Sequence, residues 1–404
     1  GTYFGGKSVA AIDGNGTIRN VNGNIRVYTT GITRSIGAAA SGGGGAGALN
    51  ATFAMAINRS TADTYIGRGV TIFAPSSDVD VFHNITAEAR AYIIAVAAGV
   101  AAVNASVVLV INNFEAHSWI GHVSSDVPGE ASGTLEARNV TVSANANTIT
   151  EGMGVAASAA LVACNGLVAL AFNTTGNKAS VSRKNLIADS VNIVSIINGN
   201  TNLIATSVAA GGIGAGAIVA VAISEADNTA ELNLSDSVMD IGHVYVSAGT
   251  ARTPNNNQAM VLGITGAAGL MTAALNIGIA RNSGYNRALV TGNQNGSLVA
   301  DSLTVNAIGL ARAYVVLASA AAGSANVQVS VAVSYLRNIQ EAKMDCESDL
   351  DIAGAVTLNS IQKTSGSDFD FGGYGLTIPA GESSNKLEGT FGAMAQALVF
   401  TAGI

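Results

Sequence analysis

The chain has 404 residues and a formal net charge of -7, and only 11% of its residues are charged, whereas 48 are Gly. A typical globular protein is about 25% charged, so this chain must bury a large area of small apolar side chains. Its 19 Lys and Arg are scattered, which excludes the basic stripe of a nucleic-acid-binding protein.

The first segment, residues 1–20, is interpreted as an N-terminal edge segment. It contains DGNGT at 13–17, which has the oxygen-rich look of a calcium loop. The motif does not continue into a complete ligand set. No metal site is therefore predicted here.

Tandem repeats follow over residues 21–362. Residues 24–67 align with 78–121 without a gap, so that Asn50 falls on Asn104 and Tyr65 on Trp119. The unit then returns five times, and its recurring opening motif ends in runs such as VTVSA and VYVSA. The second apolar residue of each motif lies 54, 61, 51, 53, 59 and 53 residues after the previous one: Val27, Val81, Val142, Ile193, Val246, Val305 and Leu358. The chain is a tandem array.

Each unit contains an apolar tract such as AYIIAVAAGVAAVNASVVLVI at 91–111, which is long enough to cross a bilayer as a helix. A six-span helical membrane bundle with Gly and Ala at its contacts is therefore an alternative. Runs such as GGGG at 42–45 disfavour helices. Trp119 is the only Trp, and arginines occur in loop after loop, so no positive-inside topology can be drawn.

The favoured interpretation is an all-β protein, a repetitive parallel β-solenoid or β-helix built of six to seven units of about 51–61 residues. The opening motifs alternate with period two, which is typical of strands. Each tract is expected to split into two strands at a Gly or Asn. A unit of this length is expected to make about two coils, so six units would form a rod of roughly 60 Å.

The pattern of VTVSA, a Gly/Ala/Val tract and a short strand such as AHSWIG resembles the repeats of large bacterial filamentous adhesins, the haemagglutinin-like exoproteins. The motifs that carry the resemblance are Val140–Ala144, Gly154–Asn173, Val244–Ala248, Ala116–Gly121 and Thr64–Gly67. The resemblance covers about residues 20–360. It implies an elongated, non-enzymatic protein at the cell surface or secreted.

Several short motifs invite a functional interpretation. Asn-x-Ser/Thr occurs nine times, but Asn50 and Asn104 recur at one repeat position inside apolar tracts, which favours stacked asparagines over glycosylation. Asp78 with Asp80 could serve a polysaccharide-active β-helix enzyme, which is a further alternative. Asp368 with Asp370 is a similar pair. The four histidines have no metal-binding spacing and are expected at the surface: His83, His117, His122 and His243.

The two cysteines lie about three units apart, too far for a disulfide. Cys164 is expected to be a buried free thiol and Cys346 the more accessible one. Closely packed layers should not tolerate bulk at Gly214 or Ala217. Replacement of Arg252, in a polar insertion, should be nearly neutral.

The sequence thus predicts a structural protein that is not an enzyme and has no catalytic, cofactor-binding or metal-binding residue. It is expected to be extracellular or at the cell surface, as a self-assembling filament or an adhesin stalk. Expected partners are copies of the chain itself, and a host or cell-surface receptor or polysaccharide. Neither nucleic acid nor a membrane span is expected. The last segment, 363–404, is a possible capping or assembly element, because its end, 391–404, is apolar and uncharged.

Overall fold

The computed structural model describes residues 1–404 except 20–22, 122–132, 363–368, 371–376, 379–391 and 403–404. The elements formed by the described residues are all strands. Among them no helix long and apolar enough to cross a membrane is found. The predicted all-β fold with stacked parallel strands is confirmed.

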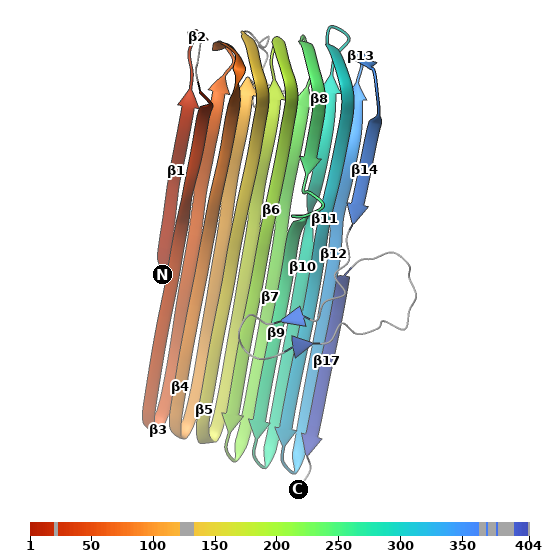
Figure 1. The fold of residues 1–404 in the computed structure, drawn as a ribbon. Helices are drawn as coiled ribbons and strands as arrows, with labels where there is room; N and C mark the ends of the chain where they lie inside the picture. The colour runs from red at the N-terminus through yellow and green to blue at the C-terminus, as the bar shows by residue number, and fades with distance from the viewer. Residues whose placement is uncertain (20–22, 122–132, 363–368, 371–376, 379–391, 403–404) are drawn as a thin grey trace.

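The described residues form seventeen strands, and several of these are unusually long because they run down one side of a coil and back up the other. They are β1 (Thr2–Ile12), β2 (Thr17–Arg19), β3 (Ile25–Gly67), β4 (Thr71–Gly121), β5 (Thr134–Ser182), β6 (Asn185–Ala210), β7 (Ile213–Asn233), β8 (Val238–Ala248), β9 (Asn255–Ala268), β10 (Met271–Gly292), β11 (Ser297–Ala322), β12 (Ala325–Cys346), β13 (Asp349–Ile352), β14 (Val356–Gln362), β15 (Phe369–Asp370), β16 (Thr377–Ile378) and β17 (Gly392–Ala402). All but β15 and β16 belong to one sheet. That sheet winds into a stack, whose strands lie side by side in Figure 1.

One repeat makes one coil, so the expectation of two coils per unit is wrong. Val27 of β3 pairs with Val81 of β4, and Gly67 pairs with Gly121, so the strand register equals the repeat of 54 residues. Every later junction is also parallel. Six coils at about 4.8 Å each give a stack of roughly 30 Å. This is half the predicted length, because each unit adds one strand spacing to the stack instead of two.

Coil 2 shows the shape that the others share. It starts at the head with 71–78, descends along 79–99, turns at the tip near Gly99 and ascends along 101–121. The two legs face each other: the Asn112 side chain donates to the Ala87 carbonyl across the coil at 2.9 Å. Each leg of about twenty residues is therefore roughly 65 Å long.

The remaining coils follow the same path. Coil 1 covers 17–67, coil 3 covers 134–182, coil 4 covers 185–233, coil 5 covers 238–292 and coil 6 covers 297–346. The extra residues of the two longest intervals lie at 122–133, between β4 and β5, and at 249–254, a loop that interrupts the descending leg of coil 5 between β8 and β9, after which the pairing resumes in register. Insertions are therefore confined to places where they do not disturb the register of the legs.

The interior consists of apolar layers separated by polar ones, from head to tip. A large aliphatic cluster fills the head, and a second, rich in Ala and Val, fills the middle of the legs. Between them one inward position carries an amide or hydroxyl in coil after coil: Asn58, Asn112, Asn173, Ser224, Asn282 and Asn338. These side chains bond to the facing leg or to the next coil. Buried amides are tolerated because such bonds offset their desolvation.

A buried cation ties together the turns at the head. Arg183 has no solvent exposure, and its guanidinium donates to the carbonyls of Gly67 and Arg68 at 2.9 Å each and to that of Val70. Burial lowers the pKa of Arg183 to about 10, so the group stays charged at neutral pH. The turn after coil 3 therefore holds the turn between coils 1 and 2.

Candidate assembly surfaces

The N-terminal end of the stack carries a long open strand edge. β1 pairs only with 56–66 of β3, so within the described chain residues 25–55 pair with coil 2 on one side and with nothing on the other. This edge contains no Pro and only two charged residues, Arg26 and Arg34. Proline, lysine and bulges are the usual devices that stop strands from adding to an edge. Most of this edge lacks them.

The C-terminal end has a matching open edge. β12 pairs only with β10, while β13, β14 and β17 pair with β11, and no further described strand covers them. On β12 the half from Ala325 to Leu336 is uncharged and free of Pro. Parallel strands therefore end in unpaired backbone groups at both ends of the stack.

The two ends are stepped in complementary ways. β1 occupies the ascending leg of a coil that precedes coil 1, and β13, β14 and β17 occupy the descending leg of a coil that follows coil 6. The N-terminal half-coil has an ascending leg but no full descending leg, and the C-terminal half-coil has a descending leg but no ascending leg among the described residues. A further coil of the same kind can therefore continue the ladder at either end with the same register.

Ion pairs bind neighbouring coils on the outer face near the head. Asp78 accepts two bonds from Arg138 of the next coil, at 2.9 and 2.8 Å, and one from Asn139. These bonds hold the pKa of Asp78 below its usual range. Asp80 pairs with Arg26 at 3.1 Å. The two carboxylates are thus occupied in coil-to-coil contacts, and the geometry does not bring a third catalytic group to them.

The loop DGNGT forms a turn at the head that stacks on the following one. The Gly14 amide and the Tyr65 hydroxyl donate to the Asp13 carboxylate, and the Thr71 amide donates to the Gly16 carbonyl. The oxygens thus serve the turn and its neighbour. Of the other acidic pair, Asp370 lies in β15 and Asp368 lies outside the described residues.

The prediction that all four histidines lie at the surface is wrong for His83. His83 is fully buried in the polar layer below the head, where its Nδ1 lies 2.9 Å from the Ser118 hydroxyl and its Nε2 lies 2.7 Å from the side-chain amide oxygen of Asn177. Burial lowers its pKa to about 4. His117 is half-buried beside Asp63 and Glu115. His243 is exposed, and His122 lies outside the described residues. His83 faces inward because its position equals that of Thr29 and Ser195, not that of a surface turn.

The stacked asparagines were interpreted correctly. Asn50 and Asn104 are buried near the tip, where their amides donate to the carbonyls of Val96 and Ala157 in the following coils. Asn104 also donates to the Asn165 side chain at 3.0 Å. Asn58 and Asn173 are equally inaccessible. At these four positions, the Asn-x-Ser/Thr motifs reflect interior ladders.

Both cysteines are free, as predicted, and both are half-buried, so the expectation that Cys164 is buried is wrong. Cys164 points outward on the ascending leg of coil 3, between the inward-facing Ala163 and Asn165. Cys346 packs against the aliphatic cluster of the head at the end of coil 6, and burial raises the pKa of its thiol. The strand around Cys164 has apolar residues at both alternating sets of positions, so its sequence does not show which set faces the interior.

Sequence reasoning missed a groove of about 200 Å³ on the outer face of coils 4 to 6. Glu225, Asp227, Arg281, Tyr285 and Arg337 are among its lining residues. Arg281 pairs with Glu225 at 3.2 Å, and Asp227 accepts the Tyr285 amide at 3.0 Å. The repeat length would have revealed the groove: when each repeat is taken as one coil, these residues fall at neighbouring positions of successive coils. Their charges largely pair with one another across coils.

No group of three or more metal-ligating side chains occurs within the described part of the chain. Comparisons of the chain with protein-family models, curated proteins and solved structures found no match. The arrangement therefore has to be interpreted on its own geometry. Its most distinctive features are the two open, complementary ends.

Proposed function

We propose that this chain is an elongated structural element outside the cell, not an enzyme, and that it works as part of a filament or an adhesin stalk. The observation that carries the proposal is the pair of stepped, unpaired strand edges at opposite ends of one stack. Further coils of the same kind cover these edges, either from a second copy or from a longer stalk. Head-to-tail contacts of this type do not close on themselves and so build length.

The packing supports a load-bearing role. Each inner coil is hydrogen-bonded to two neighbours along both legs, and the buried Asn and Ser ladders add side-chain bonds in the same direction. The candidate carboxylates Asp78 and Asp80 are engaged in ion pairs between coils. The resemblance to filamentous adhesins supports an extracellular or cell-surface location. Such a stalk would bind a host or cell-surface receptor or a polysaccharide.

Assembly is tested by sedimentation and electron microscopy of the intact chain at micromolar concentration, compared with a Ser330→Lys variant. Ser330 faces inward on the open β12 edge, bonds to the Ser319 hydroxyl at 2.7 Å and is half-exposed. A lysine there reaches water across the open end, but an added coil would bury its charge, which is costly. We expect the parent chain to form filaments and Ser330→Lys to remain monomeric.

Val331→Lys is the matched control, because Val331 is the next residue and points to the outer face. Its charge stays in water whether or not a coil is added, so it should assemble like the parent. A dispersed monomer of the parent in plain buffer would reject self-assembly and favour a stalk whose coils are supplied by a longer chain. Equal assembly of parent and Ser330→Lys would reject the edge contact.

A further inference from the structure

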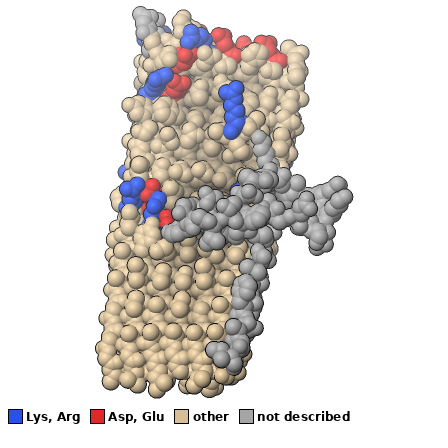
Figure 2. All heavy atoms as spheres, turned by 60° about the horizontal axis from the view of Figure 1, so that its bottom comes forward, with Lys and Arg blue, Asp and Glu red and all other residues tan. Residues whose placement is uncertain are grey.

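Charge is absent from the tip half of every coil. The spans without Asp, Glu, Lys, Arg or His are 35–58, 91–114, 152–177, 190–224, 253–280 and 313–336, and each contains the tip of its coil. Figure 2 shows the result on one face: the charged side chains gather in the head half, and the half toward the tip is uncharged. The tip half is defined by the parts of these spans that lie level with 91–112 of coil 2, because the span of coil 4 also reaches into the head, where Val191 and Ile193 belong to the aliphatic cluster.

The outer surface of the tip half is apolar as well as uncharged. On the legs Ile94, Val96 and Val208 point outward and are exposed. At the tip itself Val100 is 58% exposed, Leu161 64% and Leu270 70%. Turns at the surface of a protein in water usually carry polar residues. Three of the six turns thus expose a large aliphatic side chain, and the other three are built of Gly, Ala and Ser. Uncharged turns with exposed aliphatic side chains call for an apolar surrounding.

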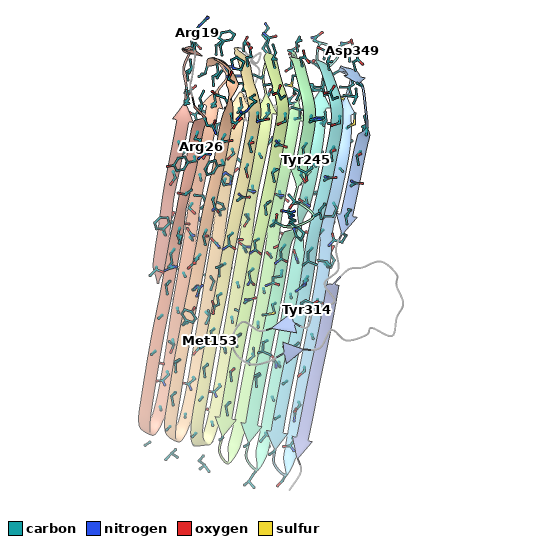
Figure 3. The ribbon with its side chains drawn as sticks, viewed as in Figure 1. Arg19, Arg26, Met153, Tyr245, Tyr314 and Asp349 are labelled. Atoms are coloured by element: carbon teal, nitrogen blue, oxygen red, sulfur yellow. The ribbon has the colours of Figure 1, made fainter. Side chains whose placement is uncertain are left out.

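Arginine and tyrosine mark the boundary between the two halves. In coils 2 and 6 three arginines on outward positions each have a tyrosine two residues closer to the tip: Arg90 with Tyr92, Arg312 with Tyr314, and Arg337 with Tyr335. Figure 3 places Tyr314 and Met153 on the legs, well below Arg26 and Arg19 of the head half. Tyrosine and arginine together are enriched where a bilayer meets water, because the ring is amphipathic and the guanidinium reaches the headgroups.

The dimensions agree with this chemistry. From Arg90 to the turn at Gly99 the leg is nine residues long, or about 30 Å. This is the thickness of the hydrocarbon core of a typical bilayer. Within the stack the backbone groups of coils 2 to 5 are bonded to neighbours on both sides, as an apolar environment demands.

The shape of the apolar surface favours lipid over a second copy of the chain. Exposed aliphatic residues occur on the descending leg, at the tip and on the ascending leg, for example Val96, Val100 and Val103 of coil 2. A copy packed face to face covers one leg and leaves the other leg and the tip in water. Lipid chains cover all three at once.

We propose that the tip half is a lipid-binding surface that enters a bilayer tip first, up to the level of Arg90. Through the strand register Arg312 lies level with Glu88 and Arg337 with Asn113, so both lie slightly nearer the head. Insertion of the turns and the adjoining parts of the legs differs from the helical span that the sequence disfavours. It rests on the proposed function in one respect: the open edges of the end coils must be covered by further coils when they meet hydrocarbon. The head half, with its ion pairs, stays in water.

Flotation with phosphatidylcholine vesicles, with and without phosphatidylserine, tests the proposal. The tip variant is Leu161→Lys with Leu270→Lys, which places two charges at the turns. The matched control is Val238→Lys with Val299→Lys, at two exposed aliphatic positions of the head. We expect the parent and the head variant to float with either vesicle, and the tip variant to lose at least tenfold in the bound fraction.

Depth is measured independently with a Leu161→Trp, Trp119→Phe variant and lipids brominated on their acyl chains. Quenching of the new tryptophan is expected, with none for the parent, whose Trp119 lies in the head half. Failure of the parent to float, equal loss in tip and head variants, or lack of quenching would each overturn lipid binding. So would a lateral dimer that the tip variant dissociates. Failure of filament assembly alone is seen separately, in sedimentation without vesicles.

Discussion

The head half and the tip half of each coil hold the same register but use different chemistry. In the head half, coils are joined on the outside by ion pairs such as Arg34 with Glu88 at 2.6 Å and by stacked rings such as Tyr65 on Trp119 at 4.4 Å. In the tip half the outer positions are aliphatic, and polar groups occur inside as Asn and Ser ladders. The register between neighbouring coils can therefore be specified by ion pairs and stacked rings on the outer face or by Asn and Ser ladders in the interior. The two halves should respond differently to substitution and to pH.

The largest effect is expected from bulk inside the tip half. Gly214 is buried, and a Cβ added there would meet the carbonyl oxygens of Ala268 and Ala209 at 3.0 and 3.1 Å. Gly214→Leu should therefore lower the free energy of unfolding by about 3 kcal/mol through overpacking. Ala217→Leu, three residues away but on the outer face, should change it little. Chemical denaturation of both variants measures the difference.

This corrects the expectation that Ala217 is as sensitive as Gly214, since Ala217 is only half-buried. Arg252→Leu, at an exposed position of the insertion 249–254, remains the neutral reference. Similar losses for Gly214→Leu and Arg252→Leu would contradict tight packing inside the legs.

A comparable but pH-dependent effect is expected in the head half. The pKa of His83 is about 4 in the folded chain, below its ordinary value of 6.5. The unfolded chain therefore takes up the proton first, and stability falls as the pH drops from about 6.5 to about 4. The full loss is about 3 kcal/mol, because one pKa unit corresponds to about 1.4 kcal/mol. Denaturation midpoints across this range measure it.

A His83→Asn variant isolates the contribution of the imidazole. It lacks the titrating group, so its stability should fall less than that of the parent between pH 6.5 and 4. Parallel pH profiles of the two proteins would show that His83 is not the responsible group. Carboxylates with a lowered pKa, such as Asp78, act below this range in both proteins.

The smallest effect is expected for the stacked rings on the outer face. Tyr65 and Trp119 occupy paired positions of coils 1 and 2, with their planes 6° apart. A double-mutant cycle with Tyr65→Leu and Trp119→Leu should give a coupling free energy of about 1 kcal/mol. The same cycle on Ile57 and Ile111, paired in the tip half without aromatic rings, should give less. A zero coupling for the aromatic pair would show that the rings do not help to set the register.

The repeat and the strand alternation were sufficient to predict the stacked parallel fold, because a repeated unit must pair with its own copies. Asn50 and Asn104 could be assigned to the interior because they recur at one position. The number of coils per unit could not be derived, since the tracts are apolar on both faces and do not show where a leg turns. Cys164 and Ala217 were placed inside for the same reason. The buried Arg183 and His83 belong to single coils, so no recurrence identified them.

The direction of the backbone hydrogen bonds, which run along the stack and across the legs, determines how the protein responds to tension. Force applied evenly between the two end faces is shared by all the bonds of one interface between coils, along two legs of about twenty residues each. Force applied through one end of the chain loads these bonds one after another, so the outermost coil peels away. The same molecule is therefore strong when it is gripped across a whole coil and weak when it is pulled by its terminus. A fibre built from it would derive its strength from the way its ends are joined.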